Sequence, residues 1–258
     1  GGYLGYYGTY SAAQMTFIAP YMWGAKASST PAAIKDADLV ICMGWSPSYS
    51  MMGSTGEAKH GFEYQHRTNT KAKYIHIDPR FNDTLCNTND EWLPIRPGTD
   101  AAVGLGFLNV IISEGLYDHE FVECWTYGFD QLAEACKEWT PERVQEVAWV
   151  DPEQLVGAAR AFATNAPSTA TWGVALDQSK ASTQAAQCFL AICAICGYID
   201  VPGGITITKP TSFIGQWRYD MMDVLDPEMA AKHIVDPDGK YALFNAGAAM
   251  GGVQGDTL

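Results

Sequence analysis

The sequence predicts an α/β fold built on a doubly wound, mostly parallel sheet with helices on both faces. Residues 39–43 form an unbroken apolar run, LVICM, that stops at Gly44, and a run without alternation is typical of a strand buried on both faces. Strand-like and helix-like segments then alternate along the chain. This alternation is the order expected of parallel strands connected by helices.

The expected strands share one feature, a turn rich in polar residues directly after each of them. The strands cover residues 38–43, 73–77 and 91–95, and the turns cover 44–48, 78–80 and 96–100. The carboxyl ends of parallel strands lie at one edge of a sheet, where α/β folds bind nucleotides. We therefore expect these turns to border a common crevice.

The expected helices occupy most of the chain after residue 100. Residues 101–112 are apolar nearly all round and predict a buried helix, which Thr99 or Asp100 could cap. Further helices are expected over 118–125, 130–138, 141–149, 151–165 and 183–196, with a strand over 168–173. Residues 205–258 give weaker signals, and 247–255 reads as loop.

Composition excludes some classes of partner. The formal net charge is −13 without a local cluster of Lys and Arg, which disfavours nucleic acid and anionic membrane surfaces. No apolar run approaches the roughly 18 residues of a spanning helix, so no direct membrane span is expected. The chain starts without Met or a signal-like segment, and we interpret it as an internal piece of a longer protein.

The turn after the first strand does not match the common nucleotide-binding motifs. It reads GWSPSY at residues 44–49 instead of G-x-G-x-x-G, and Gly104-Leu105-Gly106 falls within an expected helix. No Walker loop is present in the sequence. An NAD site and a phosphate-loop NTPase are therefore disfavoured.

The two later turns favour a guanine nucleotide. Asp78-Pro79-Arg80 alone could be an ordinary helix start. In Arg96-Pro97-Gly98-Thr99-Asp100, however, Pro and Gly constrain the backbone and place a carboxylate where a helix begins. A carboxylate there can accept two parallel hydrogen bonds from guanine N1–H and the 2-amino group, which adenine cannot offer.

At these turns the chain resembles the dimethyl sulfoxide reductase family of molybdenum and tungsten enzymes. The motifs are IDPR at 77–80 with Thr84, DEWLPIRPGTDAA at 90–102, LYDHEFV at 116–122, GFD at 128–130, Trp172-Gly173 and GYIDVPGG at 197–204. They run in the family's order from about Gly2 to Gly204. The resemblance implies a bis(molybdopterin guanine dinucleotide) cofactor with molybdenum or tungsten.

The resemblance also implies which residues bind this cofactor. Its phosphates would meet the first turn, at Gly44, Trp45, Ser46, Pro47 and Ser48. Its guanosine end would meet the other two turns, at Asp78, Pro79, Arg80, Arg96, Gly98, Thr99 and Asp100, and Trp172 and Gly173 would contact it further on. Two departures weaken the pattern, because Ser46 replaces the usual Asn and 174–177 replaces a polar Gln-Arg stretch.

Ser11 is the expected metal ligand and catalytic residue. The stretch GYLGYYGTYSAAQ at residues 2–14 resembles the segment in which a serine oxygen binds molybdenum. A hard oxygen ligand suits a high-valent molybdenum centre. A serine at this place favours oxygen-atom transfer from a small-molecule S-oxide or N-oxide as the expected reaction.

The resemblance sets the expected organisation. Residues 1–165 would form a Rossmann-like cofactor-binding domain, and 166–258 would continue into a second α/β cofactor-binding region with an irregular C-terminal part. An N-terminal part with a 4Fe-4S cluster and a C-terminal domain would be missing, so the isolated piece should be inactive. The whole bacterial enzyme would work in anaerobic respiration with an iron-sulfur electron-transfer subunit and a membrane anchor subunit. It would lie in the periplasm or on the outer face of the cytoplasmic membrane.

Two alternatives remain open. The first is a hydratase or a reductive dehydroxylase of the same fold, and the second is a guanine-nucleotide binding module without catalysis. Other candidate sites are weaker. Cys193 and Cys196 lie alone in an apolar helix and are read as core cysteines. The five histidines show no ligand spacing, and His76 in strand register is read as packing.

Overall fold

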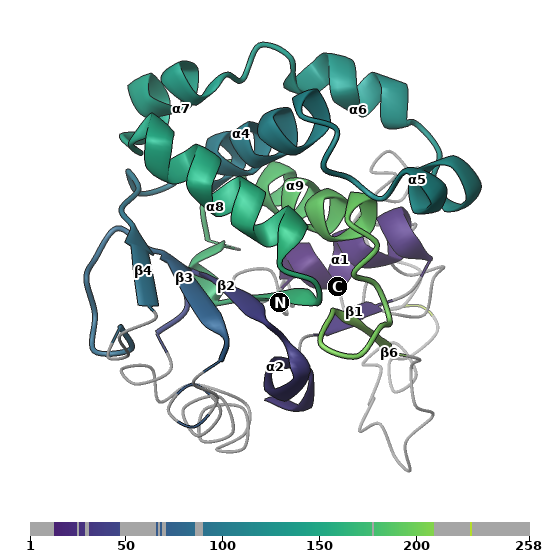
Figure 1. Cartoon of the computed structure of the whole chain (residues 1–258), viewed down its shortest axis with the longest axis horizontal. Coiled ribbons are helices and arrows are strands. Elements are labelled where there is room, and N and C mark those ends of the chain that lie inside the picture. Colours follow the sequence, from purple (N-terminus) through teal and green to yellow (C-terminus); the bar gives the residue numbers. More distant parts are fainter. Residues whose placement is uncertain are drawn as a thin grey trace.

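A four-stranded parallel sheet organises the computed structural model of the chain (Figure 1). The structure describes residues 13–24, 26–28, 31–46, 66, 68, 71–85, 90–176, 178–208 and 228. The strands are β2 (Leu39–Met43), β3 (Lys73–Ile77), β4 (Asp90–Leu93) and β5 (Ser168–Trp172), in the order β4-β3-β2-β5. The predicted α/β class with a parallel sheet is confirmed.

The strand register brings the carboxyl ends of the four strands level. Met43 at the end of β2 pairs with Ile77 on one side and Trp172 on the other, and Ile77 pairs with Leu93. The chain proceeds outward through β2, β3 and β4 and then returns to the opposite side of β2 with β5. The order therefore reverses between β2 and β5, which is where open α/β sheets leave a crevice for ligands.

Both faces of the sheet are buried, as the apolar run of β2 predicted. Leu39, Ile41 and Met43 belong to the main hydrophobic core, whereas Val40 and Cys42 belong to a smaller cluster on the opposite face. All of β2 is buried. The alternation of side chains along a strand sends successive residues to these two faces.

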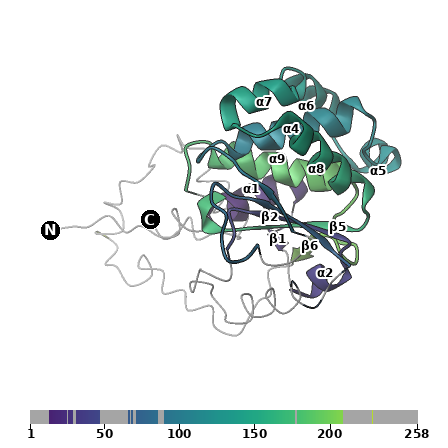
Figure 2. The same cartoon turned by 60° about the vertical axis from the view of Figure 1, so that its left-hand side comes forward.

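The main core lies under a thick layer of helices (Figures 1 and 2). This layer contains α4 (Asp100–Ser113), α8 (Pro152–Thr164), α9 (Ser182–Ile195) and α1 (Ala13–Trp23), and further out α5 (His119–Trp125), α6 (Phe129–Cys136) and α7 (Pro141–Ala148). The short helix α2 (Pro31–Asp36) lies on the other side of the sheet. Helices thus cover both faces, which confirms the doubly wound arrangement.

Several elements were not predicted. They are α1, α2, the 3-10 turn at Val174–Leu176, and a small antiparallel pair of β1 (Lys26–Ser28) and β6 (Thr206–Thr208). The predicted strands and the helices after residue 100 are present with ends shifted by a few residues. The division at 165/166 stays a prediction, and β5 beyond it pairs with β2 in the same sheet.

Gly104 and Gly106 explain how α4 can pack closely against α9 and α7 with most of its residues buried. A Cβ at Gly104 would lie 2.5 Å from Cys188 Cβ on α9, and one at Gly106 would lie 2.7 Å from Val144 Cγ2 on α7. These glycines permit close helix packing, so they do not form a nucleotide-binding turn. The expectation that they fall within a helix is confirmed.

We expect Gly104→Ala to destabilise the fold by about 1–3 kcal/mol, because overpacking outweighs the better helix propensity of alanine. Gly157→Ala in α8 is the matched control, since its Cβ would meet nothing within 4 Å. The control should gain up to about 1 kcal/mol. Urea unfolding of both variants measures the difference, and equal stabilities would contradict this account of Gly104.

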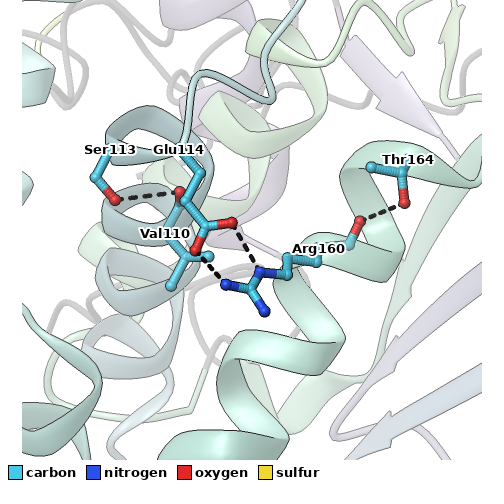
Figure 3. A network of polar contacts seen from close by, with 5 residues as sticks. All are labelled: Val110, Ser113, Glu114, Arg160 and Thr164. Carbon is cyan, nitrogen blue, oxygen red and sulfur yellow. Dashed lines mark hydrogen bonds and ion pairs between the residues drawn. The ribbon is translucent and has the colours of Figure 1, made fainter.

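An ion pair joins the end of α4 to α8 (Figure 3). Arg160 Nε and Nη2 donate to the two carboxylate oxygens of Glu114 at 2.7 and 2.8 Å. The hydrogen bonds from Arg160 hold the pKa of Glu114 below its ordinary value. Ser113 Oγ donates to the Val110 carbonyl, and Thr164 Oγ1 donates to the Arg160 carbonyl.

The stabilising effect of this exposed pair should depend on pH. Because the pKa of Glu114 is lowered by folding, the contribution is complete above the ordinary value of 4.5 and is lost as pH falls through the lowered value. We expect Arg160→Gln to lower Tm slightly at neutral pH and not at all at strongly acidic pH. Thermal unfolding against pH measures this, and a Tm difference that persists in acid would contradict it.

Candidate functional site

The turns at the carboxyl edge of the sheet are held together by main-chain hydrogen bonds. Gly44 N donates to Ile77 O at 2.9 Å, and Gly173 N donates to Met43 O at 2.9 Å. Asp78 N lies 3.4 Å from Leu93 O. The strand pairing therefore continues one residue beyond each strand end, and the turns that follow β2, β3 and β5 start from one shared edge.

The close approach of Gly173 to Gly44 marks the reversal of strand order. A Cβ on Gly173 would lie 2.1 Å from Gly44 O, and one on Gly44 would lie 3.0 Å from Ala175 Cβ. Gly44 also has φ +52°, which favours glycine. The main chains of the turns after β2 and β5 are therefore in direct contact at this edge of the sheet.

Asp78 connects the turns after β2 and β3. Its Oδ1 accepts from Arg80 N at 2.8 Å. Its Oδ2 accepts from Ser46 Oγ at 3.5 Å and from Asn82 Nδ2 at 3.4 Å. The Asp78 carbonyl accepts from Trp92 Nε1 at 2.8 Å. Asp78 thus fixes the shape of both turns, while Pro79 and Arg80 are exposed beside it.

Asp100 is a buried carboxyl group at the start of α4. It is 9% exposed. Burial raises its pKa above the ordinary value, backbone hydrogen bonding at the helix start opposes this, and the charge of Asp78 raises it further. Asp78 follows β3, and Asp100 ends the turn after β4, the parallel neighbour of β3, so both residues lie at the same edge of the sheet.

The turn before α4 is closed by its own residues. Thr99 precedes the helix, but its hydroxyl donates to Arg96 O at 2.6 Å and makes no capping bond. Gly98 has φ +78°, and its Cβ would come 3.9 Å from Ser179 Cβ. The segment after the 3-10 turn therefore borders the 96–100 turn. The helix α4 therefore begins at Asp100 without a side-chain hydrogen bond from its N-cap residue.

Arg96 and Trp172 are directed elsewhere. The Arg96 guanidinium lies over the Trp149 ring, 5.2 Å from its centroid, and Arg96 N donates to Ala148 O. Trp172 packs against the main core. Ser11, Pro47 and Ser48 lie outside the described residues. The binding roles assigned to all of these residues stay predictions.

A cavity between the helices lies away from this edge. This cavity of about 1000 Å³ is formed by side chains from α1, α5, α6 and α9 and the segments beside them, including Trp23, Phe121, Trp125 and Gln187. None of the residues of the turns after β2, β3, β4 or β5 lines it. We place the candidate site at the strand ends, because that is where the carboxylates and the bare backbone converge.

The sequence reading missed one polar cluster behind the sheet. His66 and His76 are buried, the Asp90 side chain is 3% exposed, and the three lie close together on the α2 face. Each of the three comes from a different segment of the chain, so no short sequence motif predicted the cluster. Burial of His76 in the strand, of Cys193 in α9 and of Cys196 directly after α9 is confirmed.

The sequence model of the molybdopterin oxidoreductase family matches residues 1–243 of this chain. The chain belongs to the molybdopterin oxidoreductase family. It is 31% identical over 233 residues to dimethyl sulfoxide reductase DmsA of Escherichia coli, covering 83% of this chain and 28% of that protein. It is also 29% identical over 223 residues to the probable dimethyl sulfoxide reductase chain YnfF of Escherichia coli, covering 79% of this chain and 27% of that protein. The predicted resemblance is confirmed.

Acetylene hydratase is another relative of this molybdopterin oxidoreductase chain. The enzyme of Syntrophotalea acetylenica is 45% identical over 120 residues, which cover 46% of this chain and 16% of that protein. The solved acetylene hydratase from Pelobacter acetylenicus superposes with a TM-score of 0.66 at 30% identity, covering 76% of this chain and 26% of that one. The chain spans 27% to 28% of the two reductases named above. Within its described residues, no helix has the length and apolar character to cross a membrane.

Proposed function

We propose that this chain is the cofactor-binding part of the catalytic subunit of a molybdenum or tungsten enzyme that reduces an S-oxide or N-oxide. The family implies a molybdopterin cofactor. The observation that carries the proposal is the edge where Asp78, Asp100 and the bare backbone of Gly44 and Gly173 meet. A cofactor with a flat pterin, phosphates and a guanine suits these three features.

The residues fit the guanine dinucleotide form of the cofactor. Asp100 is buried, and burial raises its pKa, so an ionised carboxylate there would gain from two donors supplied by guanine. The Ser46 hydroxyl and the backbone beyond Gly44 would meet phosphate oxygens. Gly173 lets the main chains of the turns after β2 and β5 pack directly against each other at the strand reversal. Ser46 retains a donor where the family has Asn, although it also lies 3.5 Å from Asp78.

When bound, the metal-pterin group would supply two-electron chemistry at the metal. The chain's own residues would position it, exclude water around the guanosine end and contribute one oxygen ligand from Ser11. A 4Fe-4S cluster, an iron-sulfur subunit and a membrane anchor subunit would complete the enzyme, in the periplasm or on the outer face of the cytoplasmic membrane. The assignment to a subunit of a larger enzyme is supported by a relative, thiosulfate reductase PhsA, which is 46% identical over 96 residues and is named as a molybdopterin-containing subunit.

A second candidate is a hydratase. The 45% identity over 120 residues to acetylene hydratase supports it. A reductase consumes two electrons for each oxygen removed from its substrate, whereas a hydratase adds water without a net electron transfer. Turnover assays with and without reduced viologen therefore separate the two.

The test uses the whole protein purified without oxygen. We expect two pterin guanine dinucleotides for each molybdenum or tungsten, and turnover of S-oxides or N-oxides that oxidises viologen. Acetylene hydration without viologen would select the second candidate. Absence of both metal and pterin from protein isolated from a cofactor-making host would contradict the proposal.

Ser11→Ala in the whole protein should abolish turnover while pterin is retained. Unchanged turnover would remove Ser11 from the metal shell. We also expect the 258-residue chain purified alone to lack stoichiometric molybdenum or tungsten, because it spans about a quarter of its relatives. Elemental analysis that finds one molybdenum or tungsten per chain would contradict this.

A further inference from the structure

We propose that His66, His76 and Asp90 bind a divalent transition-metal ion of the zinc class behind the sheet. His76 lies in β3, Asp90 begins β4, and His66 comes from the segment between β2 and β3. Tyr74, the residue that pairs with Asp90, packs in the smaller cluster on the α2 face, so this site lies on the other side of the sheet from the main core. The site is independent of the molybdopterin crevice.

The ligand atoms are already close. His66 Nε2 lies 2.7 Å from Asp90 Oδ1, and His76 Nε2 lies 3.8 Å from the same oxygen. The three ligand atoms lie within 4.8 Å of one another. An ion about 2.0–2.2 Å from each ligand would hold them roughly 3.3–3.5 Å apart in tetrahedral geometry. Ligation therefore requires side-chain shifts of only about an ångström.

The imidazole of His76 is buried and, within the described part of the chain, lacks the hydrogen bonds that a buried polar group normally makes. It is 1% exposed, and neither ring nitrogen has a hydrogen-bond partner among the described residues. A buried polar group without a partner is expensive, and an apolar side chain would pack in a strand at no such penalty. A bound cation would give the Nε2 lone pair a partner and explain why a histidine occupies this strand position.

The donor set indicates the kind of ion. Two imidazole nitrogens and one carboxylate oxygen suit zinc and its neighbours, whereas calcium and magnesium prefer oxygen ligands throughout. The side chains of the three ligands are only 1–3% exposed. A metal ion bound between them would therefore be shielded from solvent. The ion would join β3, β4 and the segment of His66, just behind the strands that lead to Asp78 and the 96–100 turn.

The experiment measures zinc alongside molybdenum and tungsten in the whole protein without an affinity tag. After chelation and equilibration with trace Zn²⁺, the parent protein should hold one zinc per chain. His76→Val and Asp90→Asn should hold less than about a tenth of that. Co²⁺ in place of Zn²⁺ should give the visible bands of a four- or five-coordinate ion in the parent protein only.

Two controls keep the result interpretable. His76→Val places a β-branched apolar residue in a buried strand, so its Tm without metal should equal or exceed that of the parent. His119→Gln removes an imidazole from the start of α5, remote in sequence from the three ligands, and should leave zinc unchanged. Absence of zinc from the parent protein, or full zinc in His76→Val, would overturn the proposal whatever the molybdenum content.

Discussion

Gly173→Ala should unfold the chain at a Tm lower by about 6–12 °C, because the added methyl group would collide with the main chain. The ideal Cβ lies 2.1 Å from Gly44 O and 3.1 Å from Trp45 Cα. Neither contact can be relieved by rotating a side chain. Overpacking against the main chain should lower the free energy of unfolding by about 3 kcal/mol or more, at the upper end of the range for such substitutions. Each kcal/mol lowers Tm by about 2–4 °C in a domain of this size.

The same substitution should also remove the cofactor from the whole protein. Relief of the collision has to move the Gly44 turn away from β5, and this turn is the proposed floor of the cofactor crevice. Calorimetry and pterin extraction measure the two effects. Gly157→Ala, the same chemical change where nothing lies within 4 Å, should not lower Tm and should leave the pterin content unchanged. A Gly173→Ala protein with parental Tm and pterin would show that the turns are not in close contact.

The sequence was informative where structure is local or where burial leaves a composition signal. The apolar run of β2 predicted a strand covered on both faces, and both of its faces are buried. The order of strands and helices predicted the parallel sheet. Polar turns after each strand then indicated the edge where a ligand would bind, because parallel strands end together.

Long-range pairing accounts for what was missed. β1 pairs Lys26 with Thr208, and three-residue strands so far apart in sequence carry no local pattern. The same reason hid His66, His76 and Asp90, which meet only because β3 and β4 align Tyr74 with Asp90. The direction of Arg96 toward Trp149 depends on the end of α7, which the turn's own residues do not determine.

Asp100→Asn should weaken retention of the guanine dinucleotide by about 10- to 100-fold, which corresponds to about 1–3 kcal/mol for a lost pair of charge-assisted hydrogen bonds. An asparagine presents one acceptor and an N–H₂ group, and the N–H₂ would face a guanine donor. The fold itself should not suffer. Folding raises the pKa of Asp100, so its ionised form reduces stability above the ordinary value of 3.8, and removing the charge removes that reduction.

Cofactor retention should depend on pH in a way that identifies this carboxylate. Guanine requires the ionised form, so the parent protein should lose cofactor as pH falls through the raised pKa of Asp100. The Asp100→Asn protein should be weaker at neutral pH and lack this transition. Pterin guanine dinucleotide retained after dilution at each pH measures both.

Asp130→Asn provides the matched control for Asp100→Asn. Asp130 is the acidic residue in the first turn of α6, as Asp100 is in α4, but it is exposed and belongs to the outer helices. Loss of a helix-start carboxylate alone should therefore leave cofactor retention at the parental level. If both substitutions reduced retention equally, the effect would come from the helices and not from guanine recognition. If neither did, the guanine would have to bind without the only buried carboxylate that the described turns place beside Asp78.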